Sequence, residues 1–267
     1  MSVAILIPAR YASQRFPGKP LVNLVGASGE SKSLIERSWL AALDVAGADY
    51  VAVTTDDERI REVAEGFGAD VIMTSSECRN GTERCAEAVS SLGEDTEIVV
   101  NLQGDAPLTP AWFIEDLIEG LRQHPEADLA TPVLRADGAT LAGFLEDRRA
   151  GRVGGTTAVF SSTHRAIYFS KEVIPYIAQH VEGDEKETPV FHHVGVYAYR
   201  PQSLKEYANW PVGELENLEG LEQLRFLEQN RHVQCVEVEA KGRQFWELNN
   251  PEDVPKIEAM LADMGIE

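Results

Sequence analysis

Three basic side chains near the start of the chain form the first candidate binding site. Arg10, Arg15 and Lys19 lie within the first 29 residues, which contain no Asp or Glu, whereas the 267-residue chain has 24 basic and 44 acidic side chains and a net charge of −20. Gly18 lies between two prolines in a stiff turn and can adopt a positive φ, which lets the backbone approach a phosphate closely. Three cations at fixed positions in an acidic chain indicate a polyanionic ligand. The alternative is a surface loop with three solvated cations.

A carboxylate that follows a predicted strand is a candidate metal ligand. The basic loop likewise follows a predicted strand, the apolar run 3–7. Asp105 follows Gly104 shortly after the apolar run 98–102. Loops that leave the carboxyl ends of parallel strands meet at one edge of the sheet, so we expect Asp105 on the same side as the basic loop. There it can hold Mg²⁺ against phosphate oxygens, and Gly104 leaves room for a nucleotide to pass. The alternative is an Asp that caps backbone groups in an ordinary turn.

Arg84 is a further candidate for binding an anion. It lies in the segment Asn80-Gly81-Thr82-Glu83-Arg84, where a turn runs into a predicted helix. A helix N-terminus favours anions, and an Arg in its first turn would extend such a site, although Glu83 opposes it. A surface Glu-Arg helix start is the alternative.

Two polar residues on a predicted helix could contact a substrate. The segment 214–229 has the period of an amphipathic helix, in which Glu222 falls between Leu215, Leu218 and Phe226 on the apolar side, with Gln223 next to it. A carboxylate on a buried face needs a partner or a function. It could pair with Arg225 three residues later, or Glu222 and Gln223 could bind substrate hydroxyls.

Two adjacent histidines form the last candidate group. His192 and His193 directly precede the predicted strand 194–199, and adjacent residues in a strand point to opposite faces. They therefore cannot both serve one site.

Alternating strands and helices position these residues in an α/β fold with a mainly parallel central sheet. Apolar, β-branched runs predict strands at 3–7, 50–55, 70–73, 98–102, 129–134, 157–160, 194–199 and 233–238. Helical periodicity and N-cap signals predict helices at 33–46, 57–67, 82–92, 110–123, 214–229 and 251–264. The pattern loosens after about residue 150, so we expect one domain over 1–267 with a smaller substructure in its second half.

Composition excludes several classes of protein. A net charge of −20 argues against binding to nucleic acid or to an anionic membrane surface. The apolar run at the N-terminus is too short for a membrane span or a signal peptide, which favours a cytoplasmic protein. The sequence has none of the motifs of covalent catalysis, so phosphoryl chemistry by positioning and charge neutralisation is the expected activity.

The segment from Pro8 to Leu21 resembles the N-terminal signature of the 3-deoxy-manno-octulosonate (Kdo) cytidylyltransferases, the CMP-Kdo synthetases. The resemblance continues in order along the chain at Thr55-Asp56, Asn80 to Arg84, Gln103-Gly104-Asp105, Tyr168-Phe169-Ser170, His193 to Arg200 and Leu221 to Arg225. It implies a Rossmann-like nucleotide-diphospho-sugar transferase fold and a homodimer, with residues 160–235 serving sugar binding and dimerisation. It also implies Mg²⁺-dependent transfer of CMP from CTP to a 3-deoxy-ulosonic acid, as in lipopolysaccharide synthesis.

The resemblance also implies roles for individual residues. Arg10, Lys19 and Asp105 would be catalytic, with Asp105 a metal ligand. The remaining matched positions would hold the nucleotide (Ala9, Arg10, Arg15, Lys19, Arg84 and Gln103) or contact the sugar acid (His193, Glu222 and Gln223).

The chain departs from the family pattern at two places. Asn249 stands where the family has an Asp expected as the second metal ligand, so the site would rely on Asp105, the phosphates and Glu247 as a substitute, with Asn249 offering a neutral amide oxygen. The segment from Gly154 to Phe160 lacks the usual lysine, which leaves room for a different ulosonic acid. Two other interpretations stay open: a transferase of the acylneuraminate type, or a CTP-binding protein with impaired catalysis.

Overall fold

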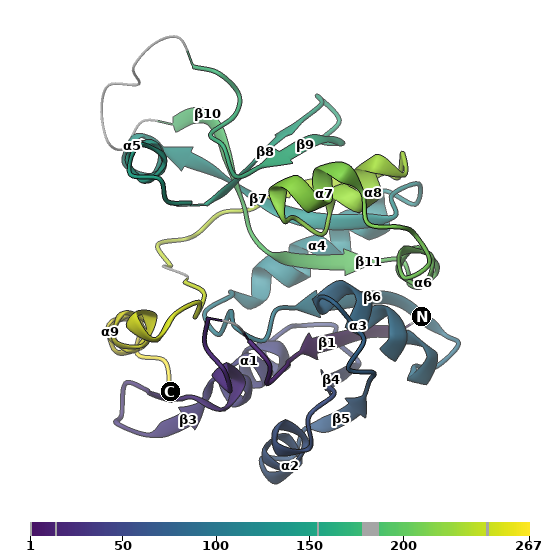
Figure 1. Cartoon of the computed structure of the whole chain (residues 1–267), viewed down its shortest axis with the longest axis vertical. Coiled ribbons are helices and arrows are strands. Elements are labelled where there is room, and N and C mark those ends of the chain that lie inside the picture. The colour runs from purple at the N-terminus through teal and green to yellow at the C-terminus, as the bar shows by residue number, and fades with distance from the viewer. Residues whose placement is uncertain (1, 14, 154, 178–186, 244–245) are drawn as a thin grey trace. The chain divides into compact units, whose positions relative to one another are not determined.

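The computed structural model describes residues 2–13, 15–153, 155–177, 187–243 and 246–267 (Figure 1). Gly154, in the segment that lacks the usual lysine of the family, lies outside the described residues. So do residues 178–186, within the range 160–235 expected to serve sugar binding and dimerisation. The chain forms two compact units, one of Met1–Glu115, Ala198–Ala208 and Ala240–Glu267, and the other of Asp116–Tyr197 and Asn209–Glu239. The single domain expected over 1–267 stays a prediction.

Four parallel strands form the centre of the first unit. They are β1 (Ser2–Pro8), β4 (Tyr50–Thr55), β5 (Asp70–Met73) and β6 (Thr96–Leu102), in the order β5-β4-β1-β6. The chain builds outward from β1 through β4 to β5 and then returns to the other side of β1 with β6. Ligands of open α/β sheets bind at such a switch point, beyond the carboxyl ends of the strands. The loops after β1 and β6 leave from this place.

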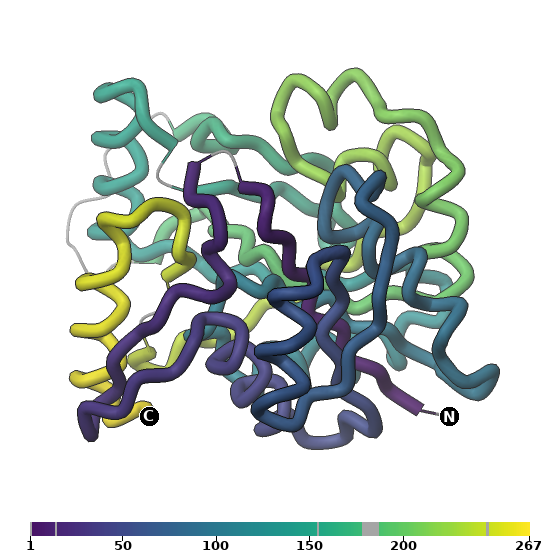
Figure 2. The backbone as a smooth tube through the Cα atoms, turned by 60° about the horizontal axis from the view of Figure 1, so that its bottom comes forward, coloured from purple at the N-terminus to yellow at the C-terminus, as the bar shows by residue number. Residues whose placement is uncertain are grey.

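Helices of the first unit begin at side chains that cap them. Ser33 accepts from Glu36 N at the start of α1 (Leu34–Leu43), Asp57 from Arg59 N at α2 (Glu58–Gly66), and Asn80 from Glu83 N at α3 (Gly81–Ala88). The unit also contains short 3₁₀ turns, a hairpin of β2 (Asn23–Val25) and β3 (Ser31–Ser33), α6 (Pro201–Tyr207) and α9 (Val254–Met264). Figure 2 shows α9 beside this hairpin, where Leu24 and Leu261 are buried in one cluster.

The second unit has a sheet of mixed direction. Strand β7 (Leu129–Asp137) pairs in parallel with β12 (Val233–Glu237) and antiparallel with β10 (Glu187–His193), which continues antiparallel to β8 (Thr156–Phe160) and β9 (Ala166–Ser170). Helix α5 (Gly138–Arg149) follows β7, while α4 (Ala111–Gln123) and β11 (Val196–Tyr199) carry the chain between the units. The α/β class is confirmed, but the strands are only partly parallel.

The long helix predicted over 214–229 is wrong. The segment forms two short helices, α7 (Glu214–Glu219) and α8 (Leu224–Glu228). Gly220 ends α7 with a φ of 63° and donates from its N–H to Glu216 O at 2.7 Å. Leu218, expected on the buried face, is 74% exposed. A left-handed glycine therefore replaces the continuous amphipathic face that the leucine spacing suggested.

Within the described parts of the chain, no helix is long and apolar enough to cross a membrane.

Candidate functional site

The loop after β1 is folded back on itself. Ala9, buried at the start of the loop, donates its N–H to Thr54 O on the neighbouring strand at 2.9 Å. Further on, Gly18 N donates to Tyr11 O at 2.9 Å and closes the loop. Gly18 has a φ of 71°, which confirms the left-handed conformation expected for it. A short 3₁₀ turn, Lys19–Leu21, follows and fixes the backbone at Lys19.

Lys19 and Asp105 form an ion pair across the switch point. Lys19 Nζ lies 2.5 Å from Asp105 Oδ2, and both side chains are mostly shielded from solvent. The loops after β1 and β6 therefore do meet, as the parallel topology predicts. A point cation and a carboxylate at one place suit a ligand that brings both negative phosphates and a cation.

Asn249 lies beside this pair. Leu248 N donates to Asp105 O at 2.9 Å, which holds the segment 247–249 against the loop after β6. The side-chain oxygen of Asn249 accepts from Arg15 Nη2 at 3.0 Å, and its amide nitrogen lies 3.5 Å from Glu247 Oε2. Asn249 thus links Arg15 of the basic loop to the carboxylate of Glu247, two residues before it in the sequence.

Glu247 adds a second carboxylate near Asp105. Loss of solvation and the negative charge of Asp105 raise the pKa of Glu247 to about 7, while Asn249, Lys19 and Arg15 act in the opposite direction. Glu247 is exposed as a residue, so solvent screens part of this effect. The negative charge of Asp105 therefore disfavours the charged form of Glu247, and a cation bound beside both carboxylates would offset this repulsion.

Gly104 serves packing. A Cβ atom at this position would lie 2.7 Å from Pro8 O and 3.4 Å from Ile35 Cδ1. The glycine is therefore required where the β6 loop crosses the end of β1, which is a different reason from the passage of a nucleotide.

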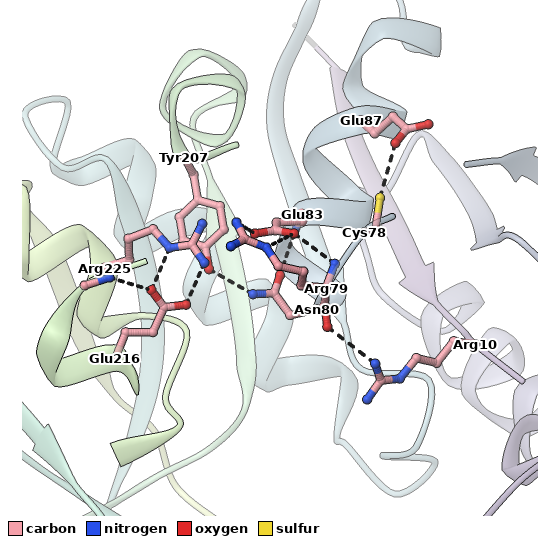
Figure 3. Close-up of polar contacts among 10 residues, drawn as sticks. Arg10, Cys78, Arg79, Asn80, Glu83, Glu87, Tyr207, Glu216 and Arg225 are labelled. Carbon is pink, nitrogen blue, oxygen red and sulfur yellow. Dashed lines mark hydrogen bonds and ion pairs between the residues drawn. The ribbon is translucent and has the colours of Figure 1, made fainter. Parts of the chain in front are cut away.

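Arg10 points to the start of α3, whereas Arg15 and Lys19 contact Asn249 and Asp105. Arg10 Nη1 donates to Arg79 O at 3.4 Å, and Arg79 in turn pairs with Glu83 (Figure 3). Asn80, the cap of α3, also donates to Tyr207 OH at 3.2 Å. The basic loop therefore touches both the 247–249 segment and the α3 start.

Arg84 is buried in α3. Its guanidinium lies 3.0 Å from Asp56 Oδ1 and donates to Thr74 Oγ1. In this arrangement Arg84 links α3 to the ends of β4 and β5. Gln103 lies against the N-terminus of the same helix, since its side-chain oxygen is 3.3 Å from where a Cβ of Gly81 would be.

The two histidines of β10 point to opposite faces, as expected. His193 is 5% exposed, its Nε2 lies 2.9 Å from Thr131 Oγ1, and its ring packs against Phe169 and Tyr197. His192 packs against Phe144 instead. Burial lowers the pKa of His193 to about 3, so its imidazole is neutral at physiological pH.

Gln223 shares the second unit with His193 and carries an unsatisfied donor. Its Oε1 accepts from Tyr197 OH at 3.1 Å, while its Nε2 is buried and has no hydrogen-bond partner among the residues that the structure describes. Glu222 precedes it in the turn between α7 and α8 rather than on a helix face. Sequence reasoning missed Tyr197, although the alternation within the predicted strand 194–199 could have placed it beside His193.

Arg225 has a buried carboxylate partner in α7. Arg225 Nε and Nη2 each donate at 2.7 Å to the carboxylate of Glu216, in a buried bidentate pair (Figure 3). The turn at Gly220 folds α7 back toward α8, which brings Glu216 to Arg225. The pairing of Arg225 with Glu222 stays a prediction.

Comparisons with known proteins define the class. The profile of a family described as Cytidylyltransferase matches residues 4–233, so the chain is a nucleotidyltransferase. It is 42% identical over 265 residues to a 3-deoxy-manno-octulosonate cytidylyltransferase of Maricaulis maris, covering 99% of both chains. It is also 40% identical over 268 residues to an 8-amino-3,8-dideoxy-manno-octulosonate cytidylyltransferase of Shewanella sp. (strain ANA-3), covering 98% and 99%.

A solved structure agrees with these relatives. The structure of CMP:2-keto-3-deoxy-manno-octonic acid synthetase complexed with CTP matches with a TM-score of 0.82 and 31% identity, covering 99% of this chain and 100% of that one. The chain belongs to the CMP-Kdo synthetase family of cytidylyltransferases.

Proposed function

We propose that this protein transfers CMP from CTP to 3-deoxy-manno-octulosonate and releases pyrophosphate. The observation that carries the proposal is the Lys19–Asp105 pair, with Arg15, Glu247 and Asn249 around it, at the switch point of the parallel strands. In this reaction the anomeric hydroxyl attacks the α-phosphorus, the bond to the bridging β-phosphate oxygen breaks, and the hydroxyl proton passes to water. Negative charge collects on the phosphates, where fixed cations stabilise it.

The basic loop would hold the triphosphate. Lys19, released from Asp105, would donate to phosphate oxygens, and Arg15 would swing from the neutral amide of Asn249 to do the same. Arg10, at the start of α3, would reach the nucleotide together with Ala9 and Gln103. Arg84, buried against Asp56, would act by holding α3 in place.

The donors around Asp105 fit Mg²⁺. They are carboxylate and amide oxygens, which this ion prefers, and Mg²⁺ is usually held by one or two carboxylates together with substrate phosphates. We propose Asp105 and Glu247 as its protein ligands, with Asn249 orienting Glu247. The bound ion would neutralise phosphate charge and orient the α-phosphate. Because Asn249 removes one charge, impaired catalysis with retained CTP binding is the second candidate function.

Gln223 is a candidate contact for the acceptor sugar acid. Gln223 Nε2 is a buried donor with no partner in the described part of the chain, and an oxygen of a sugar acid would satisfy it at little further cost. Relatives named for 3-deoxy-manno-octulosonate and for its 8-amino-3,8-dideoxy analogue have nearly equal identity, 42% and 40%. The 8-amino acid is therefore the alternative acceptor.

A panel of acceptors tests the proposal. Purified protein with CTP and Mg²⁺ is given each of the two acids and an acylneuraminate, and pyrophosphate release is measured. We expect the largest kcat/KM with 3-deoxy-manno-octulosonate. Preference for either of the other acids would overturn that choice, and CTP binding by calorimetry without turnover on any of them would favour the impaired protein.

We also propose a homodimer formed through the second unit. The second unit exposes large apolar side chains that such an interface would cover: Ile167 in β9 is 62% exposed, Leu218 in α7 is 74% exposed and Tyr176 is 89% exposed. Light scattering should give twice the mass of 29.4 kDa. A monomeric mass at the concentrations of the activity assay would contradict the dimer.

A further inference from the structure

Tyr11 holds the loop that presents Arg15 and Lys19 through both its backbone carbonyl and its ring. The carbonyl of Tyr11 accepts from the N–H groups of Ser13 and Gly18, each at 2.9 Å. A Cβ atom at Gly18 would lie 3.1 Å from the Tyr11 ring, so the ring packs directly against the backbone one residue before Lys19. The conformation of Lys19 therefore depends on the position of this ring.

Arg59 of α2 covers the same ring. Its Cζ lies 3.3 Å from the ring centroid, which is a close cation–π contact. Asp57, the N-cap of α2, fixes the guanidinium by accepting from Arg59 Nε at 2.9 Å and from Nη2 at 2.6 Å. A continuous set of contacts thus runs from the start of α2 through Arg59 and Tyr11 to Gly18.

We propose that Tyr11 and Arg59 are positioning residues that hold the loop 9–21 in the conformation in which Arg15 and Lys19 meet the triphosphate. The inference rests on the proposed function. A loop that is already ordered loses less conformational entropy when the ligand binds. The affinity for the ligand is therefore higher. Tyr11 and Arg59 act through the loop, whereas Arg15 and Lys19 contact the phosphates.

Binding and kinetics of matched variants test the inference. Tyr11→Leu and Arg59→Met should each raise the Kd and KM for CTP with Mg²⁺ about tenfold, with a smaller effect on kcat. Tyr11→Phe keeps the ring and should stay within about twofold of wild type. Arg61→Met, in the same helix and paired with Glu58, is the control and should also stay within that range. An unchanged Kd for Tyr11→Leu would overturn the inference.

Limited proteolysis gives an answer that does not depend on CTP. Trypsin can cut after Arg15, whereas Pro20 protects the bond after Lys19. We expect cleavage between Arg15 and Phe16, identified by mass spectrometry, to be several times faster in Tyr11→Leu than in wild type or Tyr11→Phe. Equal rates would overturn the inference. If wild-type protein bound no CTP, the proposed function would fail, while this measurement would still decide whether Tyr11 holds the loop.

Discussion

Lys19 Nζ lies 2.5 Å from Asp105 Oδ2, which joins the loop after β1 to the loop after β6 by a partly buried ion pair. Each member of the pair compensates the charge of the other in the absence of a ligand. A triphosphate that carries a divalent cation offers a new partner to both, since phosphate oxygens suit Lys19 and the cation suits Asp105. The pair therefore favours a ligand that brings both charges together.

Replacing Lys19 should reduce catalysis more than stability. Lys19→Met removes a donor to the charge that develops on the phosphates, and we expect kcat/KM to fall about a hundredfold or more. Lys32→Met is the control, because Lys32 pairs with Glu30 in the β2–β3 hairpin. Steady-state kinetics with CTP as the varied substrate measures both, and a loss below threefold in Lys19→Met would contradict the role of Lys19.

Restoring a charge at position 249 should strengthen metal binding. One charge pair at ~4 Å is worth about 4 kcal/mol at an effective dielectric constant of 20, so even a screened carboxylate in Asn249→Asp should raise affinity at least several-fold. Mn²⁺ titration by electron paramagnetic resonance, in the presence of a non-hydrolysable CTP analogue, measures this. Asn250→Asp is the control and should leave the affinity unchanged.

Glu247→Gln tests the other half of the metal site. If Glu247 supplies the second carboxylate, its loss should weaken Mn²⁺ binding in the same titration, since Asp105 alone would remain. An affinity equal to that of wild type would remove Glu247 from the site.

His193 should make the protein less stable in acid. Its pKa falls from 6.5 to about 3 on burial, so between these values the unfolded chain binds more protons than the folded one. The free energy of unfolding then rises with pH in this window, and the stability is lost as pH falls from about 6.5 toward 3, by up to ~1.4 kcal/mol per pH unit. The free energy of unfolding, measured in urea at pH 4.5 and 6.5, should differ less between the two pH values in His193→Phe than in wild type. An unchanged slope in His193→Phe would contradict the buried neutral imidazole.

The pair between Glu216 and Arg225 should be important for stability. Removing one member leaves a buried charge without its bidentate partner, so Glu216→Gln should lower the free energy of unfolding by about 3–5 kcal/mol. Glu214→Gln, an exposed residue of the same helix, is the control. Equal urea midpoints for the two variants would show that the ion pair contributes little.

The sequence predicts the first half of the fold well, because its signals there are local. The strands at 50–55 and 70–73 have the observed bounds, since short apolar runs between turns determine them. The helix over 214–229 fails because Leu215 and Leu218 continue the helical period up to Gly220, and the periodicity carries no sign of the left-handed turn. The strand at 187–193 was missed because its antiparallel partners β7 and β8 lie far from it in the sequence. The strand at 166–170 was missed although it pairs antiparallel with the nearby β8.

The contacts of the candidate site also differ in whether the sequence predicts them. The meeting of Lys19 and Asp105 follows from parallel topology, which the sequence predicts. The contact of Arg15 with Asn249 joins residues 234 positions apart and could not be derived from any local pattern. The stacking of Arg59 on Tyr11 likewise depends on how α2 packs beside the loop.

Formation of a CMP-sugar is the most direct test of the central claim. Wild-type protein and Asp105→Asn are incubated with CTP, Mg²⁺ and 3-deoxy-manno-octulosonate, and the product is identified by mass spectrometry alongside pyrophosphate. We expect wild type to form CMP-3-deoxy-manno-octulosonate with one pyrophosphate per product, and the variant to form it at least about a hundredfold more slowly. Absence of the CMP-sugar with wild-type protein, or equal rates for the two proteins, would contradict the account.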